Sequence, residues 1–534
     1  MRPKRIIRKP EPLELPASVV ERVNRVHAFH DATKLSAQAV SDATGRLDPD
    51  SRPSPYRTFP DLPRTSLPTS LLDIPASTLS LLASGADPMR EDVPQPPHDL
   101  KTLATLLHMA GGLTRKADSE FLRSCPSAGG LYPCEIYIAA FAIEGLESGL
   151  YHFCPRQFIL SRLRDGPETL GRLKRGRPDL EFLKTVPAVL LVSTIYWRSA
   201  WKYGLRAYRY CLLDAGHLVQ NLALCAAGLD MGTITRLRVP DAACRELIGV
   251  PADAPFDSAE NVQAMIVWAD ASEHSFAAPA AGGPLPAIAR PPLSARFTNH
   301  ADIVTAHHDC VAPGVVMAEV RPPLTELTPL PEDFPTGQIE PQPVDVGKPL
   351  RQALLDRRSV REFAQRSLAR DALAHVSRLS FRSGTFFPIK PDGPHVGLVR
   401  PLWLVNDVAG MDRGIWYYHP PTDRWSLIGA GDFRRDGRFV CLDQDHCGDA
   451  GAICFLAVNL HALMTRGGPD TYRLAHLEAG VAGQRFYLAA EALGLGCCAV
   501  GAFYDEEVRK LLTMEGSGWE VLYAMALGAR RDER

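Results

Sequence analysis

Two segments of this chain repeat one another without a gap, always 264 residues apart. Tyr208-Arg209 matches Tyr472-Arg473, and the register is held as far as Gly232 and Gly496. Between them lie three further matches: Asp214-Ala215-Gly216 with Glu478-Ala479-Gly480, Gln220 with Gln484, and Leu229 with Leu493. Repetition of this kind predicts two copies of one domain. Such a chain corresponds to a homodimer fused into one polypeptide, an intrachain pseudo-dimer with approximate twofold symmetry.

The repeated segment is expected to form a long helix in both copies. Its apolar residues recur at steps of three and four: Tyr208, Leu212, Ala215, Val219, Leu222 and Ala226. Glycines that follow Ala227 and Ala492 mark the ends of the two helices. The small Ala-Gly pair in the middle predicts that each helix packs closely against another helix.

Proline divides the chain. The 45 prolines concentrate in residues 49–97 and 276–349, which predicts extended connectors. We therefore expect four parts: a Pro-rich N-terminal extension (1–97), a first domain (98–275), a Pro-rich linker (276–345) and a second domain (346–534). The two domains are called the first and the second copy below. Both mix helical periodicity with short apolar runs such as AVLLVSTIY and ICFLAVNL, which predicts an α/β or α+β fold.

Composition excludes several classes of protein. The chain has 59 Lys and Arg against 61 Asp and Glu, so no basic field is present to bind a nucleic acid. Its longest apolar runs are about half of the ~20 residues that cross a bilayer, so no membrane span is expected. Twelve dispersed cysteines without a CxxC pair, and no signal peptide, predict the reducing cytoplasm. A P-loop and a Rossmann fingerprint are both absent from the sequence.

The second copy carries candidate ligand-binding residues. Arg357-Arg358-Ser359-Val360-Arg361 places three guanidiniums and a hydroxyl within five residues. Arginine forks match phosphate oxygens, to which a serine adds a further donor. Gly494 to Phe503 forms a glycine-rich turn after the repeated helix, where backbone can approach a ligand closely.

The first copy carries a different set. Pro126 to Pro133 (PSAGGLYP) is a small-residue loop that leads into a predicted strand and exposes amide donors to a flat ligand. Lys202-Tyr203 places an amine beside a phenol just before the repeated helix. Either group becomes a base if its pKa falls toward neutrality. His307-His308-Asp309-Cys310 has metal-binding side chains but no second cluster at ligand spacing, so it is interpreted as structural and no metal is predicted.

Together these segments resemble the nitroreductase-like flavoproteins, and within them the tandem-domain form of the SagB-type azoline dehydrogenases. That group oxidises thiazoline and oxazoline rings in ribosomal peptides. The matching segments are Pro126 to Pro133, Lys202-Tyr203, Tyr208 to Gln220, Arg357 to Arg361 and Gly494 to Phe503. Phe29 to Lys34 (FHDATK) is similar to the His-x-x-Thr-Lys opening of tandem members. The resemblance implies two tandem α+β domains, each a mostly antiparallel sheet flanked by helices, with FMN bound where they meet.

The two copies are not equivalent. The Arg-Arg-Ser-x-Arg tetrad occurs in the second copy only, and the intact Pro-Ser loop occurs in the first copy only. The loop's counterpart in the second copy, Gly393 to Leu398, is degraded, and Arg466-Gly467 stands where the first copy has Lys202-Tyr203. In the family's dimer, the tetrad and the glycine turn come from one subunit and the loop from the other. The sequence therefore predicts one complete FMN site, built from both copies, and one decayed site.

The resemblance also implies roles for individual residues. Lys202 and Tyr203 would be the catalytic base and its partner, in either order. The expected FMN-binding residues are Arg357, Arg358, Ser359 and Arg361 at the phosphate and polar edge, Pro126, Ser127, Ala128, Gly129 and Gly130 against the isoalloxazine, Val500, Gly501 and Ala502 along it, and Arg530 or Arg531 at the phosphate.

The expected reaction is a two-electron oxidation of an azoline ring, in which a base removes a ring proton, a hydride passes to the flavin and oxygen reoxidises it. The substrate is a peptide or a small heterocycle, and a cyclodehydratase is a candidate partner. Two alternatives stay open: an NAD(P)H-dependent nitro or quinone reductase of the same fold, and a non-catalytic scaffold subunit of a peptide-modifying complex. The protein is expected to be a monomeric pseudo-dimer or a homodimer.

Overall fold

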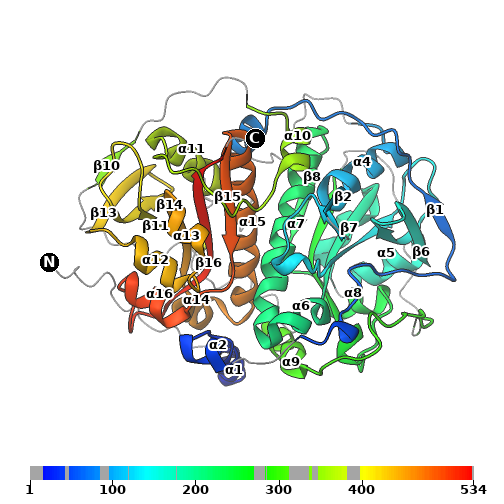
Figure 1. Ribbon diagram of the computed structural model, residues 1–534. Coiled ribbons are helices and arrows are strands. Elements are labelled where there is room, and N and C mark those ends of the chain that lie inside the picture. Colours follow the sequence, from blue (N-terminus) through cyan, green and yellow to red (C-terminus); the bar gives the residue numbers. More distant parts are fainter. Residues whose placement is uncertain are drawn as a thin grey trace.

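The computed structural model describes residues 16–42, 47–84, 96–117, 120–175, 177–269, 283, 285–311, 336–339, 347–381 and 397–531. Most of the expected linker (276–345) and Gly393 to Val396 of the degraded loop lie outside the described residues. Figure 1 shows two sheets on either side of a central pair of long helices.

The elements of the N-terminal extension, the first copy and the following segment are α1 (Ala17–Ala32), α2 (Ala37–Asp42), η1 (Pro49–Ser51), β1 (Arg64–Ser66), α3 (Thr78–Ser84), α4 (Leu100–Gly111), β2 (Leu113–Ala117), β3 (Glu120–Arg123), η2 (Ala128–Gly130), β4 (Cys134–Ala140), β5 (Gly149–Cys154), β6 (Ile159–Asp165), α5 (Gly166–Lys174), η3 (Pro178–Thr185), β7 (Ala188–Ile195), α6 (Tyr196–Tyr203), η4 (Gly204–Arg206), α7 (Ala207–Gly228), β8 (Thr233–Arg236), α8 (Asp241–Leu247), η5 (Phe256–Ser258), β9 (Glu260–Trp268) and α9 (Ala301–Cys310). The η elements are 3-10 turns.

The remaining elements are β10 (Thr336–Gln338), α10 (Leu350–Asp356), α11 (Arg370–Phe381), β11 (Arg400–Val405), β12 (Gly414–His419), β13 (Arg424–Ala430), α12 (Arg434–Val440), α13 (Asp445–Asp449), β14 (Ala452–Asn459), α14 (Leu460–Gly467), α15 (Asp470–Ala492), β15 (Leu495–Val500), α16 (Asp505–Leu511) and β16 (Trp519–Ala529).

The two copies have the same sheet topology. The first sheet has seven strands in the order β1-β6-β5-β4-β7-β9-β8, and the second has seven in the order β10-β13-β12-β11-β14-β16-β15. Neighbouring strands within both sheets are antiparallel. The strands match one to one, so the repeat seen in the central helix extends through the whole domain. The predicted class, α+β with two antiparallel sheets flanked by helices, is confirmed.

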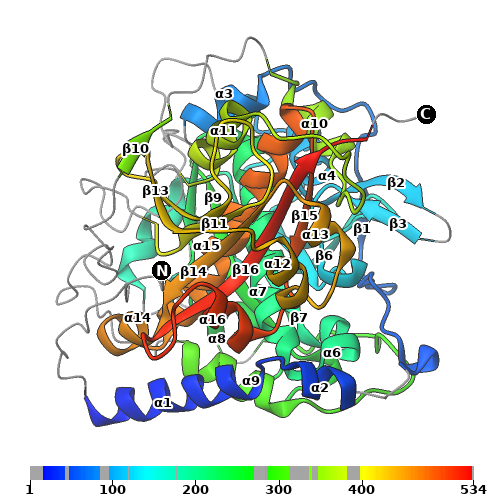
Figure 2. The same ribbon diagram turned by 60° about the vertical axis from the view of Figure 1, so that its left-hand side comes forward.

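Two segments expected to be irregular contain regular structure. Within residues 49–84, β1 adds an edge strand to the first sheet by pairing with β6, and α3 forms a short helix that packs against α15 and α11 of the second copy and α7 of the first. The described part of the linker region contains α9, which packs against α1 (Figure 2). Proline content predicted the lack of long elements here but not these short ones.

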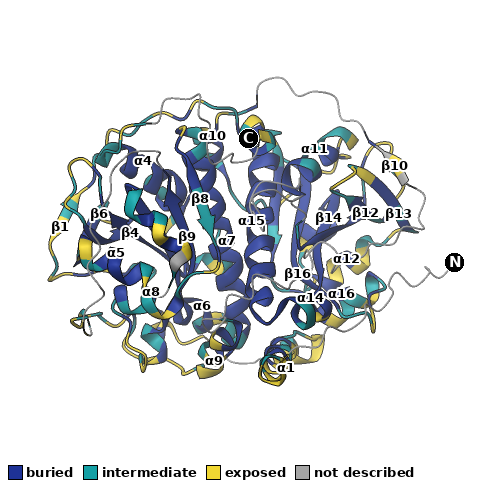
Figure 3. Cartoon of the chain, turned by 180° about the vertical axis from the view of Figure 1, so that it is seen from behind, coloured by how far each residue is buried: buried dark blue, intermediate teal, exposed yellow. Residues whose placement is uncertain are grey.

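The central helices are α7 and α15, the two predicted copies of the repeated helix. Nearly every residue of both is buried (Figure 3), which fits helices enclosed by a sheet on one side and by each other on the other. They cross at Gly216 and Gly480, where a Cβ on Gly216 would overlap the Leu477 carbonyl and one on Gly480 would overlap the Leu213 carbonyl. Only glycine permits so close an approach of two backbones.

Further contacts join the two copies along this crossing. The rings of Tyr208 and Tyr472 stack in parallel with centroids 6.3 Å apart. Buried polar groups are also satisfied between the copies, because His217 Nδ1 lies 2.9 Å from Gln484 Oε1 and Gln484 Nε2 donates to Asn221 Oδ1 at 2.6 Å. The two copies therefore share one continuous core and a pseudo-twofold axis, as the intrachain pseudo-dimer requires.

Replacing Gly480 by alanine tests the close crossing. Alanine favours a helix over glycine by about 1 kcal/mol, yet its Cβ would meet the Leu213 backbone and lie 3.0 Å from Gly216 Cα. We expect the free energy of unfolding to fall by about 1–3 kcal/mol, as for other overpacked cores. Chemical denaturation measures it. Gly429→Ala is the control, since nothing lies within 4 Å of its added Cβ; a Gly480→Ala protein as stable as this control would contradict the crossing.

Two outer hydrophobic clusters cover the faces of the sheets that point away from the central helices.

All twelve cysteines are buried and free. Within the described ranges, no helix combines the length and apolar character needed to cross a membrane.

Candidate functional site

The Arg-Arg-Ser-x-Arg tetrad follows the end of α10 and lies beside the second sheet. Arg358 Nη1 donates to the carbonyls of Leu355 and Arg357, which closes the C-terminal end of this short helix. The Val360 amide donates to the Cys497 carbonyl at 2.8 Å. The tetrad therefore runs along β15. The segment Gly494 to Phe503, expected to be a glycine-rich turn, is mostly this strand, and the turn proper is Gly501 to Phe503 after it.

Arg357 reaches from the second copy into the first. Its Nε donates to the Ser124 carbonyl at 3.0 Å, just ahead of the Pro-Ser loop, and its guanidinium lies 5.2 Å from the centre of the Tyr487 ring. The side chain is buried, but Nη1 has no hydrogen-bond partner among the described residues. This donor is therefore available for a charge-assisted hydrogen bond to an acceptor.

Ser359 is held by the repeated helix of its own copy. Its hydroxyl lies 2.8 Å from the Tyr487 hydroxyl, which also accepts the Ala499 amide at 2.7 Å. Tyr487 thus ties the tetrad, α15 and β15 into one unit. This tyrosine was not predicted as a site residue, since one buried tyrosine on a long helix has no sequence signature.

Arg361 and Arg530 differ in their surroundings. Arg361 is exposed and lies close enough to Tyr203 of the first copy to oppose the rise in its pKa. Arg530 forms an ion pair with Glu491, with Nη2 and Oε2 2.6 Å apart. Glu491 is also held by Lys348 at 2.7 Å. Arg530 would therefore have to exchange a buried carboxylate for a phosphate, whereas Arg361 has no such competitor among the described residues.

The Pro-Ser loop is anchored by a carboxylate on α7. Ser127 Oγ donates to Asp214 Oδ2 at 2.6 Å, and the Ala128 amide donates to Oδ1 at 3.2 Å. Gly129 and Gly130 have φ values of +64° and +67°, which side chains rarely adopt. A Cβ on Gly129 would lie 2.6 Å from Tyr203 Oη, while nothing lies within 4 Å of one on Gly130. The loop therefore packs on Tyr203 through one glycine and leaves open space at the other.

The anchoring carboxylate has a counterpart in the second copy. Glu478, the repeat partner of Asp214, accepts the Val399 amide at 3.1 Å, at the end of the degraded loop. Burial raises the pKa of both carboxyls to about 7. The repeat alignment contained this pair of carboxylates, which was the available sequence signal, but their contact with the loops needs the tertiary structure.

Lys202 and Tyr203 lie at the end of α6, next to the loop and to the second copy. Lys202 is exposed, and its Nζ lies 5.4 Å from the centre of the Tyr203 ring. The Tyr203 and Tyr210 rings meet edge to face at 4.8 Å, and the Tyr210 hydroxyl donates to the Gly501 carbonyl at 3.1 Å. Burial, with smaller effects of Tyr210 and Asp214, raises the pKa of Tyr203. Its hydroxyl is therefore protonated at neutral pH.

A cavity lies behind the Pro-Ser loop in the first copy. Its polar lining comes from Arg123, Ser127, Tyr132, Glu135 and Asp214. The Arg123 guanidinium lies 4.7 Å from the centre of the Tyr132 ring. The backbone amide of Tyr132 donates to Ser127 Oγ at 2.8 Å. The loop residue Ser127 thus contributes to a partly polar cavity of the first copy.

The structure brings the predicted site residues of both copies together. The tetrad meets the residues just before the loop through Arg357, the loop meets the dipeptide through Gly129, and the turn meets Tyr210 through Gly501. Val500 at the end of β15 is buried, and Ala502 in the turn is half-buried. Arg530 lies near the tetrad, since its backbone bridges Phe363, but its side chain is paired with Glu491. Arg531 is likewise paired, with Glu362. The arrangement places a cationic tetrad, a glycine-containing loop and a titratable pair at one junction between the copies.

His307 to Cys310, interpreted from the sequence as structural, form the C-terminal end of α9. Among the described residues, no group of three or more His, Cys, Asp or Glu side chains is arranged to hold a metal ion. His307 is instead buried in α9, with Nδ1 3.2 Å from the Tyr208 hydroxyl. It belongs to the contacts around the pseudo-twofold axis.

Comparison with known proteins adds independent findings. A model of the nitroreductase family matches residues 93–267 and 422–529, together just over half of the chain. MJ1384 of Methanocaldococcus jannaschii, which is named for the nitroreductases, is 33% identical over 155 residues, covering 29% of this chain and 76% of MJ1384. The microcin B17-processing protein McbC of Escherichia coli is 30% identical over 109 residues, covering 20% of this chain and 40% of McbC. A crystal structure of a nitroreductase-like protein from Anabaena variabilis has a TM-score of 0.73 and 24% identity, covering 95% of this chain and 99% of that one.

Proposed function

The chain belongs to the nitroreductase family, and we propose that it is an FMN-dependent oxidoreductase of the SagB type, which dehydrogenates thiazoline or oxazoline rings in a ribosomally made peptide. The observation that carries this proposal is the site between the two copies. A phosphate-binding tetrad of the second copy there meets the Pro-Ser loop of the first copy, beside Lys202 and Tyr203.

FMN fits the residues that meet there. The buried Arg357 Nη1 is without a partner in the described part of the chain, and Gly130 opens onto space where a Cβ would meet nothing. Arg357, Arg358, Ser359 and Arg361 would hold the phosphate and polar edge, with Arg530 as a further phosphate contact. The flat ring would lie between Pro126 to Gly130 and Val500 to Ala502. When bound, FMN supplies the hydride acceptor.

The protein's own contribution to the reaction is position and a proton acceptor. Lys202 and Tyr203 are proposed as the base and its partner. The raised pKa of Tyr203 is the opposite of the fall that a base needs, so it favours Lys202 as the base and Tyr203 as its partner, which donates a hydrogen bond to the substrate. Asp214 keeps the loop against this tyrosine by accepting from Ser127 and Ala128.

Similarity to a microcin-processing protein supports a peptide substrate, although the chain spans less than half of the length of McbC. A cyclodehydratase is proposed as partner, because formation of an azoline ring must precede its oxidation. Oxygen is proposed to reoxidise the flavin. Three further points stay predictions: a small free heterocycle as an alternative substrate, a homodimer as an alternative to a monomer, and a cytoplasmic location. The buried free thiols are compatible with a reducing cytoplasm.

The flavin content of the purified protein tests the cofactor. We expect a yellow protein that releases about one FMN per chain on denaturation, because only one of the two pseudo-symmetric sites has all its parts. The ratio is measured from the absorbance of the released flavin against protein concentration. A ratio near two would contradict the single composite site, and no flavin after incubation with FMN would favour the scaffold alternative.

The substrate class is tested separately on the FMN-loaded protein. Incubation with an azoline-containing peptide in air is expected to remove two hydrogens per ring, detected by mass spectrometry. Rapid bleaching of the flavin by NADPH, without oxidation of the peptide, would instead favour the nitro or quinone reductase.

A further inference from the structure

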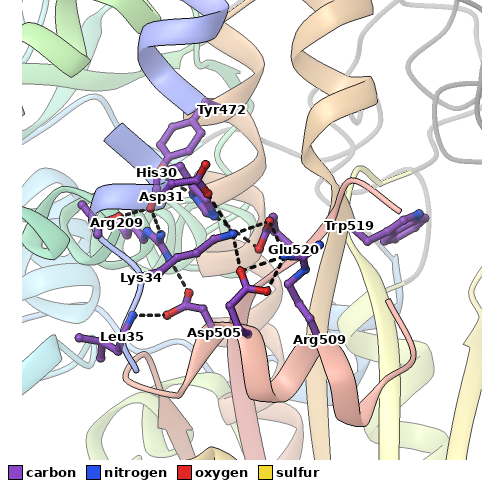
Figure 4. A network of polar contacts seen from close by, with 12 residues as sticks. His30, Asp31, Lys34, Leu35, Arg209, Tyr472, Asp505, Arg509, Trp519 and Glu520 are labelled. Carbon is purple, nitrogen blue, oxygen red and sulfur yellow. Dashed lines mark hydrogen bonds and ion pairs between the residues drawn. The ribbon is translucent and has the colours of Figure 1, made fainter. Parts of the chain in front are cut away.

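The last turn of α1 and the residues that follow it join both copies next to the candidate site (Figure 4). The carbonyls of His30 and Thr33 accept from Arg209 and Arg206 of the first copy, and the Leu35 amide donates to Asp505 of the second. We call residues 30–35 together with Arg206, Arg209 and Asp505 the N-terminal clamp. His30, Thr33, both arginines and Asp505 are buried.

Asp505, the first residue of α16, is the centre of the clamp. Its carboxylate accepts from Arg206 Nη1 at 2.7 Å, from Arg209 Nη1 at 2.8 Å and from the Leu35 amide at 2.8 Å. The Asp505 amide donates back to the Leu35 carbonyl at 3.1 Å. Arg209 Nη2 also donates to the His30 carbonyl at 2.6 Å. These charge-assisted contacts fix the segment, α7 and α16 relative to one another.

Arg206 connects the clamp to the site. Arg206 Nη1 donates to the Thr33 carbonyl at 2.8 Å and Nε to the Tyr210 hydroxyl at 2.9 Å. Its Nη2 donates to the Gly501 carbonyl at 3.1 Å. Tyr210 in turn packs edge to face on Tyr203. The position of the Gly501 turn and of the Tyr203 ring therefore depends on a guanidinium that the N-terminal segment holds.

Lys34 adds ion pairs between the N-terminal clamp and the second copy. Its Nζ lies 2.9 Å from both Glu506 Oε1 and Glu520 Oε1 and 3.0 Å from Asp31. Burial alone would lower the pKa of Lys34, but these carboxylates outweigh burial and raise it to about 12.

Part of the clamp is mirrored at the other pseudo-symmetric corner. His30 Nδ1 of α1 lies 3.3 Å from the Tyr472 hydroxyl, and His307 Nδ1 of α9 lies 3.2 Å from the Tyr208 hydroxyl. Since Tyr208 and Tyr472 are repeat partners, α9 is the counterpart of α1. Asp241, the repeat partner of Asp505, lies 3.4 Å from His307 Nε2. His30 and His307 are 277 residues apart rather than 264. The relation between α1 and α9 is therefore not seen when the sequence is compared with itself at the 264-residue offset.

The mirrored corner lacks the connecting parts. Asp470 stands where the first corner has Arg206, and Leu237 stands where it has Gly501. Arg473, the repeat partner of Arg209, donates to Gln263 Oε1 at 3.1 Å rather than to a carboxylate. The intact clamp thus coincides with the corner that holds the tetrad, the Pro-Ser loop and Lys202-Tyr203.

We propose that the N-terminal clamp is a positioning device for the flavin site, with Arg206 and Asp505 as positioning residues that set the Gly501 turn and Tyr210 against Tyr203. This inference rests on the proposed FMN site. It does not depend on the identity of the substrate, since it concerns how the cofactor pocket is held in shape.

Two matched pairs of variants test the clamp. Asp505→Asn removes the charge that holds both arginines, and Asp241→Asn makes the same change at the mirrored corner. Arg206→Lys keeps the charge near Asp505, but lysine cannot reach Thr33, Tyr210 and Gly501 together; Arg238→Lys is its control, because Arg238 pairs with Asp470 at 2.7 Å in the mirrored corner. The full chain is used, with FMN as the probe. The dissociation constant of FMN and the visible circular dichroism of the bound flavin are measured.

We expect Asp505→Asn and Arg206→Lys to weaken FMN binding about tenfold or more and to change the flavin dichroism, while both control variants stay within about twofold of wild type. Equal effects at the two corners, or none at either, would overturn the clamp even though wild type binds FMN. If Asp505→Asn does not fold, the Arg206→Lys and Arg238→Lys pair decides. A wild-type protein that binds no FMN would overturn the proposed function and this inference with it, so the two failures are distinguishable.

Discussion

The double variant Arg357→Ala/Arg361→Ala is expected to lose FMN on desalting. Arg357 is buried with one donor unused, and Arg361 lies beside Tyr203 across the interface. Two charge-assisted contacts to a phosphate contribute about 1.5–3 kcal/mol each. Their loss would raise the dissociation constant by about 10²- to 10⁴-fold. Equilibrium titration of the apoprotein with FMN, followed by the quenching of flavin fluorescence, measures the change.

The control for this variant removes two arginines that flank the tetrad. Arg351 contacts Leu72 and Asp73 from α10, and the exposed Arg366 contacts the Arg530 carbonyl. Arg351→Ala/Arg366→Ala is therefore expected to keep FMN affinity within about threefold. A double tetrad variant that stays yellow with unchanged affinity would rule out the composite phosphate site.

Removing the titratable pair is expected to separate binding from turnover. Lys202→Ala and Tyr203→Phe should both leave FMN bound, because neither change touches the tetrad and phenylalanine keeps the ring that packs on Tyr210. Loss of a general base slows a reaction by about 10²- to 10⁴-fold. Single-turnover reduction of the bound flavin by an azoline peptide measures this step directly. The variant with the greater loss identifies the base.

Arg466 offers a matched control for Lys202, because it occupies the repeat position in the mirrored corner. Arg466→Ala is expected to leave the rate of flavin reduction within about twofold. If both Lys202→Ala and Tyr203→Phe reduce the flavin as fast as Arg466→Ala, then the base lies elsewhere.

Much of the architecture was predictable from local patterns. The helical periodicity from Tyr208 to Ala226 and the 264-residue register led to α7 and α15, and the Ala-Gly pair led to their close packing. The family was predictable because its motifs are short and contiguous. The roles of Lys202, Tyr203, the tetrad and the loop stay predictions, as does the division into four parts.

The residues that position the site were not predictable in this way. Asp214 and Glu478 are carboxylates on buried helices, and their contacts with the loops span 87 and 79 residues. Arg206 reaches Thr33 across 173 residues and Asp505 across 299. The ion pair of Arg530 with Glu491, which a phosphate would have to displace, was not visible in the sequence either.

The amino-acid sequence alone is enough to establish that the chain has two copies of one α+β domain, to which family they belong, and which copy carries which motif. Periodicity, repeat register and contiguous motifs depend on residues close together in the sequence or at a constant offset, so they can be found without a structure. The meeting of the N-terminal segment, α7 and α16 at one corner, and the correspondence of α9 with α1 at the other, become visible in the folded chain. Contacts of that kind depend on how two domains pack about an axis, and the glycine crossing of α7 and α15 sets that axis.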